Sequence, residues 1–245
     1  MINLAVFGAN GRMGKELVKL ALADENIDLV YSFTKENNDY NELFKANVII
    51  DFSTPAASVE LLEKASLLDN PPALVVGTTG LKDEYFKKAK SYKGKFFWAS
   101  NTSLGVAILN ELTKIAALAL KEFDIEIYEK HHKHKVDAPS GTALTLAKNA
   151  LEARNKALNK EHKICFNREG KREDNEIGLV SLRGGSVAGY HSVGFYGDDE
   201  SIELIHNANS RVIFAKGAIN VAKWLITKEN KNYSMNDFVG ELLNK

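Results

Sequence analysis

The glycines that follow the first apolar run restrict the possible folds of this chain more than any other feature. Residues 2–7 read INLAVF, and Gly8, Gly11 and Gly14 follow with the spacing G-x-x-G-x-x-G, at the start of an amphipathic segment at 12–23. Glycine lets the backbone turn sharply and approach a ligand closely, while the free amides at a helix N-terminus attract a phosphate. Such a loop between a strand and a helix is typical of dinucleotide-binding folds, and a tight turn without a ligand is the simpler alternative.

The rest of the first hundred residues alternates short apolar runs with longer mixed segments. The apolar runs predict strands at 28–33, 47–53, 73–80 and 95–101, and the mixed segments predict helices at 55–68 and 82–92. Strands separated by helices of this length indicate βαβ units and a parallel sheet. Strands that are apolar throughout suit a sheet that is covered on both faces. We therefore predict an α/β domain at the start of the chain.

The pattern changes after residue 101. Long helices are predicted at 104–123 and 142–158, with a strand at 124–132 between them. Further β-rich segments then follow without intervening helices, at 162–168, 176–185, 186–197 and 200–208. Consecutive strands of this kind indicate a mixed or antiparallel sheet and hence a second domain. A final long helix is predicted at 211–226, and we expect the polar segment 167–176 to be an exposed, mobile hairpin or loop.

Composition narrows the possible partners and surroundings. The chain has 245 residues, and its 32 Lys and Arg balance 32 Asp and Glu, so no net charge favours nucleic acid or an anionic membrane. The single cysteine, Cys165, excludes an intrachain disulfide and fits a reducing cytoplasm. The apolar run at the N-terminus stops at Gly8 and has no basic segment before it, so we interpret it as a strand and not as a signal peptide. No apolar run reaches the roughly 18 residues of a membrane span.

Small and hydroxyl residues end two of the predicted parallel strands. They are Gly77, Thr78 and Thr79 after one strand, and Ala99, Ser100, Asn101 and Thr102 after the next. In open parallel sheets, ligands bind beyond the carboxyl ends of the strands. These small side chains leave room for a nicotinamide ring, and ordinary turn chemistry is the alternative explanation.

The most unusual stretch of the sequence collects proton donors and positive charges before a predicted helix. Residues 131–135 read HHKHK, and residues 124–129 alternate as a strand does, which places His131 near the carboxyl end of that strand. Ser140 is a plausible N-cap of the next helix. The unpaired amides and the dipole of that helix favour a negatively charged guest. A substrate that carries a carboxylate and must be protonated would need this combination.

Three simpler interpretations of residues 131–135 stay open. A zinc site could use His131, His132 or His134, but the chain has one cysteine and no H-E-x-x-H pattern, so we expect no metal. A solvated basic loop is the commonest fate of a charge run, and Lys133 is the residue that fits it best. A nucleic-acid patch would need interleaved aromatic residues and a basic background.

The histidine stretch carries a resemblance to a known family. Residues 129–143, EKHHKHKVDAPSGTA, resemble the signature of 4-hydroxy-tetrahydrodipicolinate reductase, the dihydrodipicolinate reductase of bacterial and plant lysine biosynthesis. Other motifs stand in family order, at 8–14, 77–79 and 99–101, in Arg183-Gly184-Gly185 and in Ser210-Arg211-x-x-Phe214-Ala215-x-Gly217-Ala218. The resemblance covers nearly the whole chain. The histidine motif is long and specific, whereas the glycine loop alone would not identify the family.

The resemblance implies a fold, an assembly and a reaction. It implies a Rossmann-type α/β domain that binds the dinucleotide, formed by residues 1–102 and 213–245. An inserted α+β domain, residues 103–212, would carry a mixed sheet, bind the substrate and form a homotetramer. The reaction would be the NAD(P)H-dependent reduction of 4-hydroxy-tetrahydrodipicolinate, a small cyclic dicarboxylate, to tetrahydrodipicolinate. Water would be lost, on the diaminopimelate route to lysine in the cytoplasm, with neither nucleic acid nor a membrane as partner.

The resemblance also implies roles for single residues. His131 matches the general acid/base of the family, and Lys135 matches its partner proton donor. Contacts to the substrate are expected from His132, Gly141 and Thr142, next to the helix cap at Ser140. The residues that match the cofactor site are Gly8, Ala9, Asn10, Gly11, Arg12, Met13, Gly77, Thr78, Thr79, Ala99, Ser100, Asn101 and Thr102.

The choice between NADH and NADPH depends on the end of the second predicted strand. Many dinucleotide sites carry an acid there, which bonds the adenosine ribose. Here Thr34 and Lys35 follow Phe33, and we expect no acid at that end. The cation favours the 2′-phosphate of NADPH, while the hydroxyl of Thr34 can still bond the ribose of NADH. We therefore expect both NADPH and NADH to be used, with NADPH favoured at low salt.

Two other functions stay open. A different two-domain oxidoreductase, such as an amino-acid or sugar dehydrogenase, would share the dinucleotide-binding half but leaves residues 131–142 unexplained. A nicotinamide-sensing regulator with a degenerate catalytic site would lack proton donors, and none is missing here. A test for turnover of the cyclic dicarboxylate distinguishes these two functions from the reductase.

Overall fold

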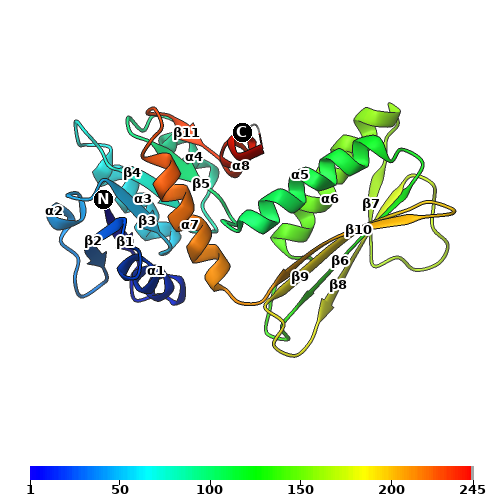
Figure 1. Ribbon diagram of the computed structural model, residues 1–245, viewed down its shortest axis with the longest axis horizontal. Coiled ribbons are helices and arrows are strands. Elements are labelled where there is room, and N and C mark those ends of the chain that lie inside the picture. Colours follow the sequence, from blue (N-terminus) through cyan, green and yellow to red (C-terminus); the bar gives the residue numbers. More distant parts are fainter. Residues whose placement is uncertain (244–245) are drawn as a thin grey trace. The chain divides into compact units, whose positions relative to one another are not determined.

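The chain folds into two compact units. A computed structural model describes residues 1–243, and its helices and strands are labelled in Figure 1. One unit comprises Met1–Leu104 and the segment that begins at Arg211, and the other comprises Gly105–Ser210. Among the described residues, no helix combines the length and the apolar character that a membrane crossing requires.

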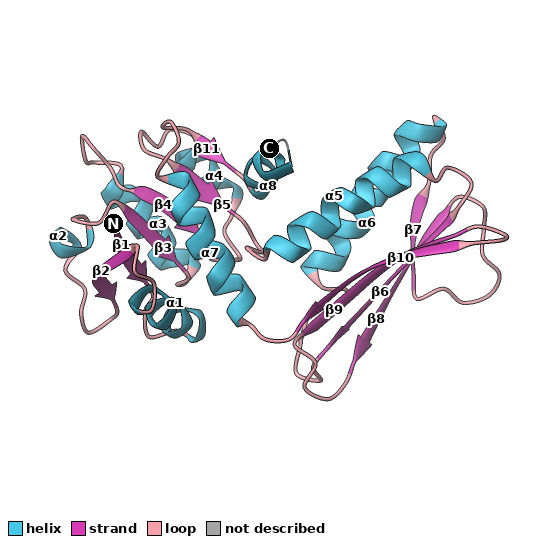
Figure 2. Ribbon diagram, viewed as in Figure 1, coloured by secondary structure: helices cyan, strands magenta, loops and turns pink. Residues whose placement is uncertain are grey.

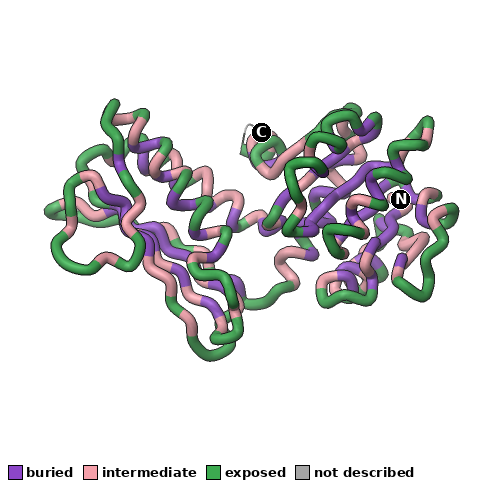
Figure 3. The backbone as a smooth tube through the Cα atoms, turned by 180° about the vertical axis from the view of Figure 1, so that it is seen from behind, coloured by how far each residue is buried: buried purple, intermediate pink, exposed green. Residues whose placement is uncertain are grey.

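The first unit is built on a parallel sheet with the strand order β11-β5-β4-β3-β1-β2. Its strands are β1 (Ile2–Phe7), β2 (Ile27–Phe33), β3 (Val48–Asp51), β4 (Ala73–Val76), β5 (Phe96–Trp98) and β11 (Asn232–Tyr233). Every neighbouring pair runs parallel, which confirms the prediction of an α/β fold with a parallel sheet. β3 and β4 are buried along their whole length, as the burial colours of Figure 3 show for the central strands. This burial explains why their sequences are almost entirely apolar.

Helices cover both faces of this sheet. On one face, α1 (Arg12–Leu22) and α7 (Val212–Leu225) share a core with the side chains of Leu4 and Val6. On the other face, α3 (Pro55–Ala65) and α4 (Asp83–Ala89) share a second core with Ala5 and Phe7. Successive residues of β1 thus serve opposite cores, as the alternation of a strand requires.

Three elements of this unit have no counterpart in the sequence prediction. They are α2 (Tyr40–Leu43), β11 and α8 (Met235–Leu243), so the helix predicted at 211–226 is not the final one. α2 and β11 are too short to produce a periodic pattern. α8 does have a local signal, because Ser234 N donates to Asp237 Oδ2 at 2.8 Å and Asp237 N donates back to Ser234 Oγ at 3.4 Å. This is a capping box, which is a recognised sign of a helix start.

The second unit contains a mixed sheet with the order β10-β9-β6-β8-β7. Its strands are β6 (Asp124–His131), β7 (Lys163–Phe166), β8 (Glu176–Arg183), β9 (Gly189–Tyr196) and β10 (Ser201–Ala208). β9 runs antiparallel to β6 and β10, whereas β8 runs parallel to β6 and β7. Figure 2 shows the strands of this sheet in magenta. The sequence predicted a mixed or an antiparallel sheet, and the structure shows that the sheet is mixed.

The two helices of the second unit cover one face of its sheet. α5 (Leu104–Ala119) and α6 (Gly141–Leu158) share a core with inward-facing side chains such as Ile125 and Ile127. The opposite face carries large side chains that stay partly exposed, including Leu182 at 47% and Ile205 at 52%.

The polar segment 167–176 is a loop and not a hairpin, because β7 and β8 run parallel. Two arginines fix it to the sheet. Arg168 bonds Glu126 and Glu176, and Arg172 pairs with Asp124 at 2.9 Å. The loop is exposed for most of its length, as predicted, but it is anchored by ion pairs.

Candidate active site

The glycine loop turns directly from β1 into α1. Gly8 has φ +85°, a conformation that side chains disfavour, and its amide and that of Ala9 both donate to the carbonyl oxygen of Phe33 at the end of β2. A Cβ on Gly14 would lie 2.2 Å from the oxygen of Gly8, so only glycine lets α1 begin this close to β1. Asn10, Gly11 and Arg12 are exposed at the helix start. The loop therefore presents its backbone and the amino end of α1 to a ligand.

The end of β3 belongs to the same site, although the sequence analysis did not include it. A Cβ on Gly77 would lie 2.2 Å from the ring of Phe52, and a Cβ on Gly8 would lie 2.9 Å from the carbonyl oxygen of Phe52. Phe52 thus sits between the ends of β1 and β4. The signal that could have identified it is its position directly after a buried strand of the parallel sheet.

Two of the expected cofactor residues turn their side chains inward. Thr78 is 4% exposed, and its Oγ1 donates to Asp51 Oδ1 at 3.1 Å and accepts from Ser53 N at 3.0 Å. Thr102 Oγ1 donates to the carbonyl oxygen of Phe214 at 2.7 Å. The Thr78 hydroxyl thus joins the ends of β3 and β4, and the Thr102 hydroxyl joins the segment after β5 to α7. Thr79 and Ser100 are exposed beside them, while Asn101 Oδ1 accepts from Ser103 N at 2.9 Å.

The region after β2 differs from the sequence expectation. Thr34 Oγ1 accepts from Glu36 N at 3.2 Å and from Asn37 N at 3.0 Å, so it shapes a turn, and Lys35 is exposed. β2 ends at Phe33 without an acid, as expected, but Glu36 Oε2 accepts from Asn10 Nδ2 at 3.1 Å, so an acid three residues further on lies next to the glycine loop. The turn folds back toward the loop, which the spacing in the sequence could not reveal. A groove lined by Asn10, Thr34 and side chains of α1 such as Val18 adjoins this turn.

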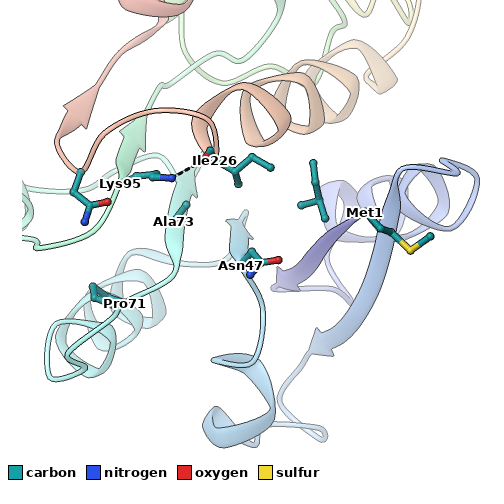
Figure 4. A pocket seen from close by; sticks show the side chains of 8 residues that line it. Met1, Asn47, Pro71, Ala73, Lys95 and Ile226 are labelled. Carbon is teal, nitrogen blue, oxygen red and sulfur yellow. Dashed lines mark hydrogen bonds between the residues drawn. The ribbon is translucent and has the colours of Figure 1, made fainter.

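A cavity of the first unit lies at the amino ends of the strands, where Met1, Asn47 and Ala73 begin or precede β1, β3 and β4 (Figure 4). Lys95 Nζ donates to the carbonyl oxygen of Ile226, the C-cap of α7. The cation thus already meets the carbonyl end of that helix. The glycine loop lies at the carboxyl ends of the strands, so this cavity is not part of the cofactor site.

The second unit brings His131 and a buried carboxylate together. His131 is the last residue of β6, and its Nδ1 is hydrogen-bonded to Glu129 Oε2. The opposite nitrogen, Nε2, faces Gly189 of β9, where a Cβ would lie 3.2 Å away. The backbone is fixed on both sides, because Gly184 N donates to His131 O at 2.9 Å and His132 N donates to Val187 O at 2.8 Å.

Ser140 is the N-cap of α6, as predicted. Its Oγ accepts from Ala143 N at 3.2 Å and lies 3.2 Å from His191 Nε2. A Cβ on Gly141 would meet nothing within 4 Å, and Gly141 is exposed, so the first turn of α6 is open to a ligand.

Burial and charge set the protonation of this cluster. Burial alone would raise the pKa of Glu129, but hydrogen bonds from Arg183 and His131 lower it below its ordinary value. Burial lowers the pKa of His131, Glu129 raises it, and the charges of Lys135 and Arg183 lower it, with a net lowering. Burial, together with the charge of His131, lowers the pKa of His191 to about 4. Glu129 is therefore ionised and His191 neutral near pH 7.

The remaining members of the basic stretch lie in the turn after β6. The strand ends at His131, and Lys135 N donates to His132 O at 3.1 Å. Lys135 Nζ donates to Asp137 Oδ1 at 2.7 Å, which lowers the pKa of Asp137. Lys133 and His134 are exposed.

Glu129, His131 and His191 could offer ligand atoms within 4.8 Å of one another. The carboxylate, however, already accepts hydrogen bonds on both oxygens, and Arg183 is its ion-pair partner at 2.8 Å. A metal ion would have to displace a guanidinium and overcome its repulsion. The donor set therefore fits a proton-transfer site better than a metal site.

Sequence reasoning missed Glu129, Arg183 and His191 as site residues. The charged residue at an inward position of β6 is a signal that could have identified Glu129.

Family models match both units. The model described as dihydrodipicolinate reductase, N-terminus, matches residues 2–102, and the one described as dihydrodipicolinate reductase, C-terminus, matches residues 105–239.

Curated relatives and a solved structure agree with this match. A 4-hydroxy-tetrahydrodipicolinate reductase of Campylobacter jejuni subsp. jejuni serotype O:6 is 47% identical, with 98% of this chain and all of the relative covered. One of Campylobacter lari is also 47% identical, with the same coverage. A dipicolinate-bound dihydrodipicolinate reductase from Paenisporosarcina sp. TG-14 superposes with a TM-score of 0.77 at 25% identity, covering 96% of this chain and 97% of that one. The Rossmann-like sheet, the buried histidine site and these similarities lead to one conclusion: the chain belongs to the dihydrodipicolinate reductase family.

Proposed function

We propose that the chain reduces 4-hydroxy-tetrahydrodipicolinate to tetrahydrodipicolinate with NADH or NADPH, on the diaminopimelate route to lysine. One hydride and one proton enter the substrate and one water leaves. The observation that carries the proposal is His131, which ends β6 beside the open first turn of α6. We also propose the cytoplasm as the compartment, because the single cysteine of the chain fits a reducing environment.

The first unit would bind the cofactor through the glycine loop and the ends of β3, β4 and β5. Gly8, Ala9, Gly11 and Arg12 would hold the pyrophosphate at the amino end of α1. Met13, Gly77, Thr79 and Ala99 to Thr102 would surround the nicotinamide, with Thr78 and Thr102 acting through their backbone because their side chains bind protein atoms. The bound pyridine nucleotide supplies the hydride.

The adenosine ribose would lie between Asn10, Thr34, Lys35 and Glu36. Lys35 supports NADPH, because a cation favours the 2′-phosphate. Glu36 supports NADH, because its carboxylate beside Asn10 opposes a second anion. Opposed charges of this kind favour dual use of the two cofactors.

The second unit would hold the dicarboxylate at the amino end of α6. The amides of Gly141 and Thr142, capped by Ser140, would receive one carboxylate, and His132 and Lys135 would neutralise charge nearby. Gly141 has open space before it, which supports this placement. Lys135 already pairs with Asp137, and the substrate carboxylate would compete for that ammonium.

His131 would donate the proton, with Lys135 as the partner donor. Nδ1 of His131 is hydrogen-bonded to Glu129, so Nε2 of His131 is the nitrogen that can reach a substrate. An imidazole donates a proton from its charged, protonated form, and Glu129 opposes the lowering of the His131 pKa by burial.

The experiment is turnover of the cyclic dicarboxylate, followed as oxidation of NADH or NADPH by the purified chain. His131→Ala should lower turnover by roughly a hundred- to ten-thousand-fold, the usual range for loss of a general acid. His134→Ala, an exposed neighbour, is the matched control and should stay close to wild type. Oxidation of an amino acid in place of reduction of the dicarboxylate would favour the alternative dehydrogenase.

A homotetramer formed through the second unit is the assembly we propose. The face of its sheet that lies away from α5 and α6 carries exposed apolar side chains, including Leu182 and Ile205. Large apolar side chains on one open sheet face support contact with other copies, and closed symmetry is the usual outcome.

A further inference from the structure

Glu129 places a carboxylate on the inward face of β6, where Ile125 and Ile127 place apolar side chains. Ile125, Ile127, Glu129 and His131 alternate on the buried face of the strand, and Glu129 is fully buried. A buried charge is costly unless it is paired and hydrogen-bonded. The position of Glu129 therefore calls for a specific role.

Each oxygen of Glu129 binds two groups. Oε2 accepts from His131 Nδ1 and from Arg183 Nη1 at 2.9 Å. Oε1 accepts from Arg183 Nη2 at 2.8 Å and from Ser140 N at 3.2 Å. Arg183 Nη2 also donates to Asp137 O at 2.6 Å. One carboxylate thus joins the end of β6, the end of β8 and the N-cap of α6.

His191 braces the same cluster from β9. Its ring meets that of His131 edge to face, with centroids 5.2 Å apart, and its Nε2 lies 3.2 Å from Ser140 Oγ. The imidazole of His131 is therefore held by a hydrogen bond on one side and by a neighbouring ring on another.

We propose that Glu129 is a positioning residue for the reduction: its carboxylate keeps a proton on Nδ1 of His131 and aims Nε2 at the substrate, and it fixes the amino end of α6 that receives the substrate carboxylate. This inference rests on the proposed function only for the role of His131 as proton donor. When His131 acts, its Nε2–H bond breaks, the electron pair stays on the nitrogen and the proton passes to the substrate. Nδ1 keeps its proton, and Glu129 stays ionised.

The charges around His131 predict how its titration depends on Glu129. The groups that face it are Glu129 on β6, Arg183 on β8, His191 on β9 and Lys135 in the turn, while α6 contributes the Ser140 amide. Glu129 raises the pKa of His131, against the lowering by burial, Lys135 and Arg183. Without this carboxylate the pKa falls further, so the protonated donor is lost at a lower pH.

Glu129→Gln tests the proposal, with Glu126→Gln as the matched control. Glu126 lies on the opposite face of the same strand and binds Arg168 and Arg172, so its replacement also breaks ion pairs. In Glu129→Gln, the side-chain oxygen stays on Arg183 and the NH₂ group turns toward Nδ1, which favours the wrong tautomer. We expect kcat to fall roughly 10- to 10⁴-fold, since misdirected tautomers reach the upper value in a Ser-His-Asp triad. The KM for the cofactor should stay within about twofold of wild type, since glycine-loop contacts are untouched.

The pH profile separates positioning from a merely structural role. In Glu129→Gln the fall of kcat on the basic side should begin at a lower pH than in wild type, while Glu126→Gln keeps the wild-type profile. An unchanged kcat and profile in folded Glu129→Gln overturns the proposal.

A nitrogen-15 NMR spectrum of the His131 ring gives a readout that needs no turnover. Wild type should show a proton on Nδ1 at neutral pH, and Glu129→Gln should lose this single form. If Arg183, left without its partner, prevents folding of that variant, Glu129→Gln combined with Arg183→Gln removes both charges and should show the same loss. The Nδ1–H form persisting in either variant refutes the positioning role. A wild-type chain that shows the expected tautomer but does not reduce the dicarboxylate refutes the proposed function instead.

Discussion

At the scale of single residues, His191 shows how burial sets a protonation state. Burial, then the charge of His131, lowers the pKa of His191 to about 4 from the ordinary value of 6.5. The charges of His206 on β10 and of Lys135 lower this pKa further, and the carboxylate of Glu129 raises it. A neutral imidazole can remain packed beside His131 where a second cation could not.

This shift predicts a pH-dependent loss of stability. Between about pH 6.5 and 4 the unfolded chain binds a proton at His191 and the folded chain does not, so the free energy of unfolding falls as the pH falls. The contribution of this group reaches at most about 3 kcal/mol. Denaturant unfolding across this range should show a shallower fall in His191→Gln than in wild type. His134→Gln is the control at an exposed histidine, and equal slopes in His191→Gln and wild type would contradict the prediction.

Two residues at the proposed ribose site should set the cofactor preference. Under the proposed function, Lys35 should favour NADPH, and Glu36, bonded to Asn10, should oppose its 2′-phosphate. Lys35→Ala should lower the NADPH-to-NADH ratio of kcat/KM and Glu36→Gln should raise it, each by about two- to fivefold, the effect of an exposed ion pair. Both shifts should shrink as salt rises. Glu84→Gln on α4 is the exposed control, and a ratio that neither variant moves would place the ribose elsewhere.

The sequence predicted His131 and the Ser140 cap because each belongs to a local pattern, an alternating strand or a helix start, and it predicted Lys135 through the family resemblance. Glu129, Arg183 and His191 come from three strands, and only the folded sheet brings them together. Glu36 was left out for the same reason, since a turn after β2 brings it back to Asn10.

At the scale of elements, long periodic segments were predictable and short ones were not. The burial alternation of β6 and the apolar run of β4 reflect packing that repeats along the chain. β11 consists of Asn232 and Tyr233, and its place beside β5 depends on a contact far away in the sequence. The mixed order of the second sheet likewise depends on pairing that local patterns do not encode.

The cap of α6 is the element whose loss should be easiest to measure. Ser140 Oγ accepts from Ala143 N at 3.2 Å, and removing an N-cap hydroxyl costs roughly 0.5–2 kcal/mol. Ser140→Ala should lower the free energy of unfolding by this amount and raise the KM for the substrate, because the helix start is the proposed carboxylate site. Thr145→Ala, which removes a hydroxyl bonded to Gly141 O on the same helix, should change stability by less than about 0.5 kcal/mol. Equal losses of unfolding free energy in both variants would contradict a specific stabilising role of the Ser140 cap.

At the scale of the whole molecule, the two units divide the proposed work. The first carries the features of a dinucleotide site at the carboxyl ends of its parallel strands, and the second carries His131, the proposed acid, and the helix start proposed to receive the substrate carboxylate. The second also keeps one sheet face free of its own helices. A fold that leaves a broad face with apolar side chains gains most by covering it with another copy.

That face predicts the assembly state. Ile205 is 52% exposed on β10, opposite Ser192 and on the same side as the paired rings of Tyr128 and Tyr190. A tetramer of 27.1 kDa chains should appear in light scattering at about four times that mass for wild type. Ile205→Glu places a charge where an apolar contact is expected, so it should shift the population toward smaller species. Leu67→Glu changes an 85% exposed leucine of the first unit and should leave the mass unchanged. A wild-type mass near that of one chain at micromolar concentration would refute the tetramer. A tetramer that persists in Ile205→Glu would place the contacts on another surface, because a buried unpaired carboxylate at each contact would cost several kcal/mol.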